Sequence, residues 1–267
     1  MLKMCVTINA EIIVKGWIMT GILYFSSTGN SLQIAKKVKE RFGGNIVYIP
    51  KYDGDGSEFQ RLFIVTPIYS FGLPTPVFDL LPRLAKDTKI IVIQNYGGMV
   101  GGADALFYDY AKQLGLRIKG IYTLKMPENY TLFLVPPKFY TKRILKSSDR
   151  RIDKILNRIE KEDYVLPKSK VKIKNKETYL KNKNNWHIIG GRFSVNDSCI
   201  KCQKCIQNCP ASNIYFEEGK IVFKDNCIAC LGCYHRCPQK AIVYLDKKSK
   251  YRYVNPNVKE NEIGKDI

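Results

Sequence analysis

Short apolar runs alternate with amphipathic segments over residues 20–162. Runs that predict buried strands lie at 21–25, 46–49, 62–65, 90–93 and 118–124. Apolar residues recur at helical spacing between them, which predicts helices at 31–42, 77–86, 103–114 and 139–162. Strands that alternate with helices in this way indicate a parallel sheet covered by helices on both faces. We therefore predict a doubly wound α/β domain over residues 19–162.

This alternation ends at residue 163. In the segment 163–190 lysines alternate with short or apolar residues, and asparagine and lysine then dominate up to Trp186. Such a sequence offers too few apolar positions for a core, so we expect a Lys-rich linker or a single edge strand. A cysteine-rich segment follows at 191–245, with a predicted hairpin at 214–223. The polar tail at 246–267 is predicted to be poorly ordered.

Residues 1–18 precede the first predicted strand as an N-terminal extension. Glu11 and Lys15 stand where a secretory signal would need an apolar stretch, and no apolar run in the chain reaches the ~18 residues that span a bilayer. We therefore expect a cytoplasmic protein with no membrane span. Translation from Met1 and translation from Met19 are both compatible with the sequence.

Eight of the nine cysteines fall in two runs of identical spacing. In each run three cysteines are separated by two residues, a fourth follows after three more, and proline comes next. Bacterial ferredoxins bind 4Fe-4S clusters with this spacing, and in two-cluster ferredoxins the fourth cysteine of each run ligates the other cluster. We therefore assign one cluster to Cys199, Cys202, Cys205 and Cys237, and a second cluster to Cys227, Cys230, Cys233 and Cys209.

Zinc sites and disulfides are the alternative uses of clustered cysteines. Zinc sites use pairs of C-x-x-C and lack the repeated fourth cysteine followed by proline. Disulfides need an oxidising compartment, and nothing in the sequence indicates export. Cys5 lies outside both runs. His235 stands between two of the cysteines, but the ligands are complete without it, so we expect an exposed side chain.

The two runs differ in charge. The first contains Lys201 and Lys204, whereas the second has alanine, leucine and glycine at similar places. Positive charge favours the more negative, reduced state of a cluster, so we expect the first cluster to have the higher potential. The alternative is that both lysines extend into water and are screened.

A hydroxyl-rich turn joins the first predicted strand to the first predicted helix. Hydroxyl and backbone N–H groups at a helix N-terminus that follows a parallel strand form a phosphate site. The Gly-rich dinucleotide fingerprint and the Gly-Lys-Ser/Thr loop are both absent from the sequence. The pattern Ser/Thr-x-Thr-Gly-x-Ser/Thr resembles the loop that binds the FMN phosphate in flavodoxins, although an ordinary helix cap is the alternative. The candidate phosphate residues are Ser26, Ser27, Thr28, Gly29, Asn30 and Ser31.

Two further loops follow the third and fourth predicted strands. In a flavodoxin-like strand order 2-1-3-4-5, both loops flank the switch point where a flavin ring would lie. Aromatic side chains suit stacking on that ring, and glycines allow close backbone approach. We favour flavin contact for Tyr69 and Tyr96, whereas for Phe71 flavin contact and ordinary loop packing weigh equally. The candidate ring residues are Pro67, Ile68, Tyr69, Ser70, Phe71, Gly72, Asn95, Tyr96, Gly97 and Gly98.

With these motifs the chain resembles prokaryotic fusion proteins that join an N-terminal flavodoxin-like domain to a C-terminal two-cluster ferredoxin. The segment 126–130 (Met-Pro-Glu-Asn-Tyr) is similar to a motif of those fusions that we expect to close over the flavin edge. Residues 1–18 and the Lys-rich linker depart from the resemblance. It implies a flavodoxin-like sheet, a small α+β ferredoxin domain, bound FMN and two 4Fe-4S clusters.

The net charge of +20 admits nucleic acid or an acidic protein as the partner. Apart from the segment 168–183 the charge is spread along the chain, so we favour acidic redox partner proteins over DNA or RNA. The two histidines, His187 and His235, lie outside the flavin loops, and no catalytic residue stands out. We therefore expect an electron carrier. The alternatives are a flavin-dependent reductase of a small molecule, fed by the clusters, and a nucleic-acid tether with structural clusters.

Overall fold

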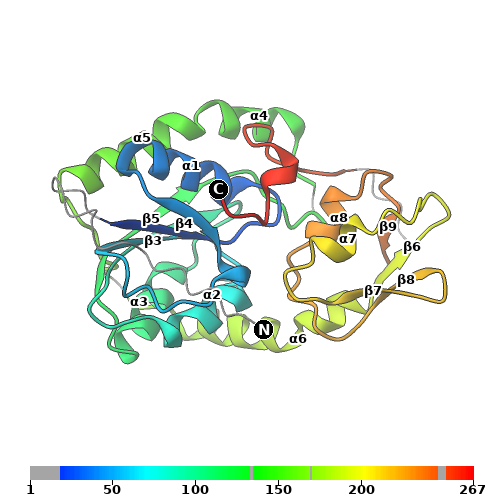
Figure 1. Cartoon of the computed structure of the whole chain (residues 1–267), viewed down its shortest axis with the longest axis horizontal. Coiled ribbons are helices and arrows are strands. Elements are labelled where there is room, and N and C mark those ends of the chain that lie inside the picture. Colours follow the sequence, from blue (N-terminus) through cyan, green and yellow to red (C-terminus); the bar gives the residue numbers. More distant parts are fainter. Residues whose placement is uncertain (1–18, 133–134, 169, 246–250) are drawn as a thin grey trace, which may run out of the picture.

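The computed structural model describes residues 19–132, 135–168, 170–245 and 251–267, and the N-terminal extension expected at 1–18 lies outside these residues. Five strands form a parallel sheet (Figure 1). Their order is β2-β1-β3-β4-β5, which confirms the predicted flavodoxin-like fold. The strands are β1 (Thr20–Tyr24), β2 (Asn45–Tyr48), β3 (Arg61–Pro67), β4 (Lys89–Tyr96) and β5 (Ile118–Lys125).

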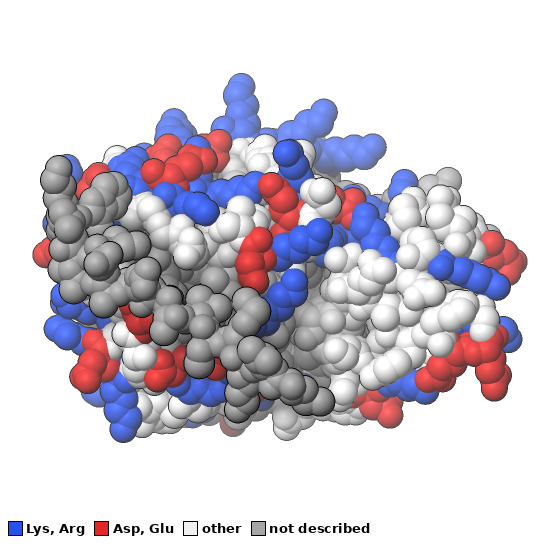
Figure 2. All heavy atoms as spheres, viewed as in Figure 1, with Lys and Arg blue, Asp and Glu red and all other residues white. Residues whose placement is uncertain are grey.

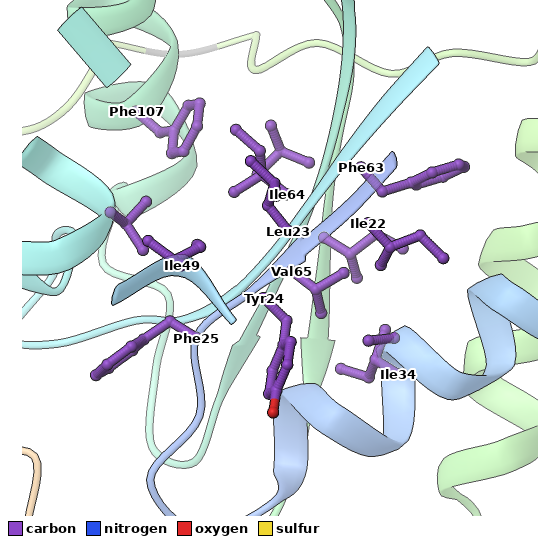
Figure 3. Packing of buried hydrophobic residues seen from close by; sticks show 14 of the residues in the cluster. Ile22, Leu23, Tyr24, Phe25, Ile34, Ile49, Phe63, Ile64, Val65 and Phe107 are labelled. Atoms are coloured by element: carbon purple, nitrogen blue, oxygen red, sulfur yellow. The ribbon is translucent and has the colours of Figure 1, made fainter. Parts of the chain in front are cut away.

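Helices cover both faces of this sheet. In Figure 1, α1 (Asn30–Phe42) and α5 (Ser148–Glu160) lie above the sheet, while α2 (Thr75–Leu80) and α3 (Ala103–Gln113) lie below it. The three central strands, β1, β3 and β4, are buried on both faces along almost their whole length, as their continuous apolar sequences require. Figure 3 shows the resulting core, in which side chains of β1 and β3 meet Ile34 of α1 and Phe107 of α3. Short 3₁₀ helices lie at Ile49–Lys51 (η1), Leu81–Arg83 (η2) and Glu260–Glu262 (η3).

The helix predicted at 139–162 is two helices. It divides into α4 (Lys138–Lys146) and α5, with Ser147 between them. The Ser147 hydroxyl donates back to the carbonyls of Arg143 and Ile144, and the Ser148 hydroxyl donates to the carbonyl of Leu145. Such side-chain bonds compete with the helical backbone pattern and favour a break.

The segment expected to be a linker forms a helix, α6 (Ile173–Gly190). Its apolar anchors are few but lie on one side, because Tyr179 and Trp186 are seven residues apart and both are buried. The Tyr179 hydroxyl donates to the carbonyl of Leu73 at 3.0 Å. The alternative of an edge strand was wrong, because two large buried aromatic residues hold a helix whose other positions are mostly polar. In Figure 1, α6 runs beneath the sheet domain toward the cysteine-rich unit.

The cysteine-rich unit is small and contains two antiparallel strand pairs. Strand β6 (Phe193–Val195) pairs with β9 (Ile242–Tyr244), and β7 (Ile214–Glu217) forms the predicted hairpin with β8 (Lys220–Phe223). The short helices α7 (Lys204–Gln207) and α8 (Gly232–Arg236) begin inside the two cysteine runs. The core of this unit consists of Phe193, Leu231, Tyr234, Ile242 and Tyr244.

The tail expected to be poorly ordered packs against the sheet domain over residues 251–267. Ile267 exchanges two backbone hydrogen bonds with Ile46, at 2.8 and 3.1 Å, beside the edge strand β2. The Tyr24 hydroxyl lies inside the last turns of the segment, where it accepts from the N–H groups of Gly264 and Lys265. The prediction was wrong because these contacts use backbone groups and single polar side chains. Figure 1 shows the segment returning from the cysteine-rich unit to the end of α1.

Within the described part of the chain, no helix has the length and apolar character needed to cross a membrane.

Candidate functional site

A cavity of about 240 Å³ lies at the carboxyl edge of the sheet, where the sheet domain meets α6 and the second cysteine run. Its walls come from the loops after β3, β4 and β5, from α6, and from the loop between Cys227 and Cys233. The lining residues are Ile68, Tyr69, Ser70, Phe71, Tyr96, Gly97, Gly98, Met99, Glu128, Asn129, Tyr130, Trp186, Ala229 and Leu231.

Seven of the ten predicted ring residues line this cavity. The other three lie behind its wall. Pro67 ends β3, Gly72 closes a tight turn by exchanging backbone hydrogen bonds with Tyr69, and Asn95 donates to the Ser31 hydroxyl at 2.7 Å. Ser70 and Phe71 have positive φ angles of 48° and 70° in that turn. Such conformations are uncommon for residues other than glycine and cluster at functional sites.

Two of the cavity residues outside the ten predicted ring residues are held in place by contacts that can be followed in detail. Trp186 of α6 meets the Tyr69 ring edge to face, with centroids 6.0 Å apart. Glu128 accepts from the backbone N–H groups of Asn129 and Tyr130, so its carboxylate is fixed in the wall beside the two glycines. The similarity of the segment 126–130 to a flavin-closing motif pointed to Glu128, whereas nothing in the sequence pointed to Trp186.

The hydroxyl-rich loop forms the N-terminus of α1, a helix of 13 residues with no acidic residue in its first turn. The Ser26 hydroxyl accepts from the Gly29 N–H at 2.9 Å, and Gly29 adopts φ 96°. The Asn129 carboxamide donates to the hydroxyls of Ser27 and Thr28 at 3.4 and 3.2 Å. Hydroxyls and free helical N–H groups suit an anion here. Asn129 therefore connects the predicted phosphate loop to the cavity that it also lines.

The loop is covered by segments that sequence reasoning did not place there. All six residues from Ser26 to Ser31 are enclosed, because Gly232 packs on Ser27 and the C-terminal segment packs on Gly29 and Asn30. Asn255 donates its backbone N–H to the carbonyl of Thr28 and its carboxamide to Asn30. The donor groups fit a phosphate, and the adjoining cavity with its aromatic and glycine walls fits a flavin ring.

His235 is buried, with 3% of its surface exposed, and the expectation of an exposed side chain was wrong. Its Nδ1 accepts from the N–H of Tyr253 at 3.1 Å, so Nε2 carries the proton and donates to the carbonyl of Asn129 at 2.6 Å. Burial lowers the pKa of His235 to about 4. The neutral imidazole thus ties α8 to the segment 126–130 on one side and to the C-terminal segment on the other.

The two cysteine runs have nearly the same local geometry. The N–H groups of Lys201 and Ala229 each donate to the sulfur of the cysteine two residues earlier, at 3.4 Å in both runs. Both residues have φ 55°, and Gln203 and Leu231 both have φ 57°. Left-handed residues and N–H donors that point at sulfur are the features that wrap a loop around an anionic cluster.

None of the eight cysteines of the runs forms a disulfide. Cys199, Cys202, Cys205 and Cys237 line one small, mainly apolar hollow, which brings together the members of the first predicted set. In the second set, the thiols of Cys227, Cys230 and Cys233 all interact electrostatically with that of Cys209. Burial raises the pKa of Cys205 to about 11 and that of Cys230 to about 12. Loss of these thiol protons at neutral pH therefore needs a cationic partner such as iron. In the described residues no three His, Cys, Asp or Glu side chains are placed to hold a single metal ion.

The second set lies next to the cavity. Ala229 and Leu231 of its loop line the cavity wall, and a Cβ atom on Gly190 of α6 would collide with Cys227. Tyr69 is close enough to Cys227 and Cys230 for their charges to act with burial in raising its pKa. No cysteine of the first set lines the cavity, and Cys202 is exposed.

Residues 198–242, which include all eight cysteines, match the 4Fe-4S dicluster domain family. Among solved structures the chain is similar to the two-electron reduced flavodoxin of Megasphaera elsdenii, with 21% identity over 39% of this chain and 85% of that chain and a TM-score of 0.36. It is also similar to the Fusobacterium nucleatum flavodoxin bound to flavin mononucleotide, with 14% identity over 54% and 98% of the two chains and a TM-score of 0.40. A third similar structure is a Lactobacillus acidophilus flavoprotein in complex with FMN, with 17% identity over 40% and 93% of the chains and a TM-score of 0.34. No curated protein matches the chain.

The chain therefore joins a flavodoxin-like sheet, defined by its strand order, to a 4Fe-4S dicluster domain.

Proposed function

We propose that this protein is a cytoplasmic iron-sulfur flavoprotein that transfers electrons between two 4Fe-4S clusters and a bound FMN and serves acidic redox partner proteins. The observation that carries the proposal is the contact between the second cysteine loop and the cavity at the sheet edge. Ala229 and Leu231 supply part of the wall that would enclose a flavin ring. FMN exchanges up to two electrons and each cluster exchanges one, so such a pair interconverts paired and single electrons.

In this proposal the cysteines hold the clusters in the crossed arrangement. Cys199, Cys202, Cys205 and Cys237 serve one cluster, and Cys227, Cys230, Cys233 and Cys209 serve the other. Convergence of the first set on one hollow supports this arrangement, and so does the electrostatic interaction of Cys209 with all three cysteines of the second loop. The N–H groups that point at Cys199, Cys209, Cys227 and Cys237 would stabilise the thiolates.

The sheet domain would hold FMN in two parts. The loop Ser26–Ser31 and the N-terminus of α1 would bind the phosphate. Tyr69, Tyr96 and Trp186 would enclose the ring, and Gly97 and Gly98 would bring backbone groups close to it. Glu128 places a carboxylate at the same cavity, where its charge opposes a negative charge on the ring.

Anaerobic purification with measurement of iron, sulfide and flavin tests the composition. We expect about eight irons and one FMN per chain. Reductive titration followed by visible and EPR spectroscopy should then show electrons moving between iron and flavin. Eight irons without flavin would remove FMN from the proposal. Turnover of quinones or nitro compounds beyond the rate of free flavin would favour a reductase over a carrier.

Cysteine variants test the crossed arrangement. Cys209→Ala and Cys230→Ala should remove the same EPR signal, and Cys237→Ala and Cys202→Ala should remove the other. Cys5→Ser is the matched control and should leave about eight irons. If Cys209→Ala and Cys202→Ala remove the same signal, the assignment is wrong.

Replacing loop hydroxyls tests the phosphate site. Thr28→Ala combined with Ser31→Ala should weaken FMN binding about tenfold or more and leave riboflavin binding nearly unchanged, because charge-assisted hydrogen bonds of about 1.5–3 kcal/mol each are lost only from the phosphate. Thr88→Ala is the control, because its hydroxyl bonds the carbonyl of Gly56, outside the loop and the cavity. Equal weakening of both ligands would contradict the site.

A further inference from the structure

The two cysteine loops are alike in sequence and backbone but differ in what covers them. Each has isoleucine after its first cysteine, and the backbone angles of the two loops agree closely. Ile228 of the second loop is 8% exposed and belongs to the core of the sheet domain, whereas Ile200 of the first loop is 61% exposed. The second loop therefore shows how a protein surface packs on this motif. The first loop presents the same apolar residue to solvent.

The residues around Ile200 add positive charge to this uncovered loop. The first loop has Lys201 at the position where the second loop has Ala229. Lys240 follows Pro238 and Gln239, which line the hollow formed by the first cysteine set. Lys201 and Lys240 are exposed, and neither forms an ion pair with any residue that the structure describes. The unit 191–245 has seven basic and four acidic residues. The docking face comprises Ile200, Lys201, Cys202, Gln203, Gln239 and Lys240, all of which are exposed.

Resting on the proposed function, we propose that an acidic one-electron carrier protein binds this docking face and exchanges electrons with the first cluster. Electrons would then pass between the docking face and the cavity through the first cluster and the second cluster. An uncovered apolar centre flanked by lysines suits a transient partner, because electron-transfer encounters bury less than about 1,200 Å² and depend on charge for steering. Figure 2 shows that the cysteine-rich unit presents a largely uncharged surface bordered by charged side chains, whereas basic side chains crowd the upper edge of the sheet domain.

Paired charge reversals test where the carrier binds. The probe is a strongly acidic bacterial ferredoxin, reduced and mixed anaerobically with the cofactor-loaded full chain in a stopped-flow instrument. Lys201→Glu with Lys240→Glu should slow electron transfer about tenfold or more at low salt, and less at high salt. Lys146→Glu with Lys154→Glu is the matched control, because it makes the same change of charge at exposed sites on α4 and α5. We expect that control to change the rate less than about twofold.

Binding without electron transfer provides the second measurement. Calorimetry with the oxidised probe should show weaker binding for the reversed pair and for Ile200→Ser. Because Ile200→Ser removes no charge, it should leave the salt dependence of the rate as in the unmodified protein. Equal slowing by the two reversed pairs would show steering by net charge alone and would overturn the docking face. Unchanged rate and binding in all variants would overturn it as well.

Dithionite separates failure of this proposal from failure of the proposed function. This small reductant needs no protein docking, so it should reduce iron and flavin equally in every variant. If dithionite leaves the flavin oxidised in the unmodified protein while the clusters are reduced, the relay itself is wrong. Normal reduction by dithionite with no effect at Ile200, Lys201 and Lys240 leaves the relay intact and rejects only the docking face.

Discussion

Tyr24→Phe should release the C-terminal segment while leaving the sheet intact. Tyr24 is fully buried in β1, and its hydroxyl accepts from Gly264 at 3.0 Å and from Lys265 at 3.2 Å. It also donates to the carbonyl of Lys265 at 2.9 Å. Burial raises the pKa of Tyr24 to about 12, so the hydroxyl keeps its proton at neutral pH. Phenylalanine retains the ring and its packing, and only the polar contacts are lost.

The size of the effect follows from the backbone N–H groups that lose the Tyr24 hydroxyl as their hydrogen-bond acceptor. An enclosed N–H that loses its acceptor costs about 1–3 kcal/mol, which corresponds to a factor of roughly 5 to 150 in a local opening equilibrium. Amide hydrogen exchange followed by mass spectrometry should therefore accelerate by that factor in peptides covering 260–267. Tyr52→Phe is the control, because its hydroxyl bonds the exposed Glu58 carboxylate. Unchanged exchange in the Tyr24 variant would refute the reasoning, and so would equal acceleration in the control.

Three further predictions concern α6 and the second cysteine set. Arg236→Met should lower the potential of the second cluster in an EPR-monitored titration, because the buried guanidinium interacts electrostatically with Cys230. Gly190→Ala should lower the iron content by up to about half, because the added methyl would collide with Cys227. Trp186→Ala should reduce the free energy of unfolding by about 3–5 kcal/mol in urea denaturation, because the side chain is buried.

Each of these changes has a matched control. Arg236→Lys keeps the positive charge, so the potential of the second cluster should stay close to that of the unmodified protein. If Arg236→Lys and Arg236→Met lower this potential equally, the hydrogen bonds of Arg236 matter and its charge does not. Gly191→Ala meets only ordinary contacts and should retain iron; loss of iron there would contradict the clash. Ile173→Ala, at an exposed position on α6, should change the free energy of unfolding by less than about 0.5 kcal/mol. A similar small loss for Trp186→Ala would show that this residue does not anchor the helix.

The environment of Arg236 also changes the expectation for the two cluster potentials. The sequence places Lys201 and Lys204 beside the first run, which predicted the higher potential there. In the structure Lys204 forms an ion pair with Glu260 at 2.6 Å, and the more distant Arg236 Nε lies 3.7 Å from the same carboxylate. Lys201 is exposed to screening water. Arg236 is buried near the second set, so its charge acts through less solvent. We now expect the second cluster to have the higher potential. Spacing along the sequence could not show which charges are paired or enclosed.

The fold could be predicted from sequence wherever apolar patterns are continuous. The strands that contain Ile22, Phe63 and Ile91 are apolar on both faces, and such runs identify a parallel sheet before its order is known. The helix α6 was missed because Tyr179 and Trp186 are its only large buried side chains among the described residues, and two such positions among lysines and asparagines leave no amphipathic pattern. Local composition was a poor guide there because tertiary contact decided the structure.

The candidate site was predictable in its loops but not in its enclosure. Tyr69 and Tyr96 could be found because they follow strands of a recognisable order. Trp186, Asn255 and His235 act through contacts with residues distant in the chain, and single polar or aromatic residues give no periodic signal. Asn255 contacts a backbone group of the loop Ser26–Ser31, and His235 contacts a backbone group of the segment 126–130. Composition does not predict such contacts.

The order of synthesis gives the C-terminal segment a further consequence. The loop Ser26–Ser31 belongs to the first strand and helix of the sheet domain, whereas its cover at 251–267 is made after every other described element. On the ribosome the loop is therefore complete while its cover does not yet exist. A phosphate-bearing ligand that reached the nascent chain would meet an open loop, whereas in the finished protein the loop is enclosed. Binding to the nascent chain and release from the finished protein would then pass through different structures, so the rate of one would not determine the rate of the other.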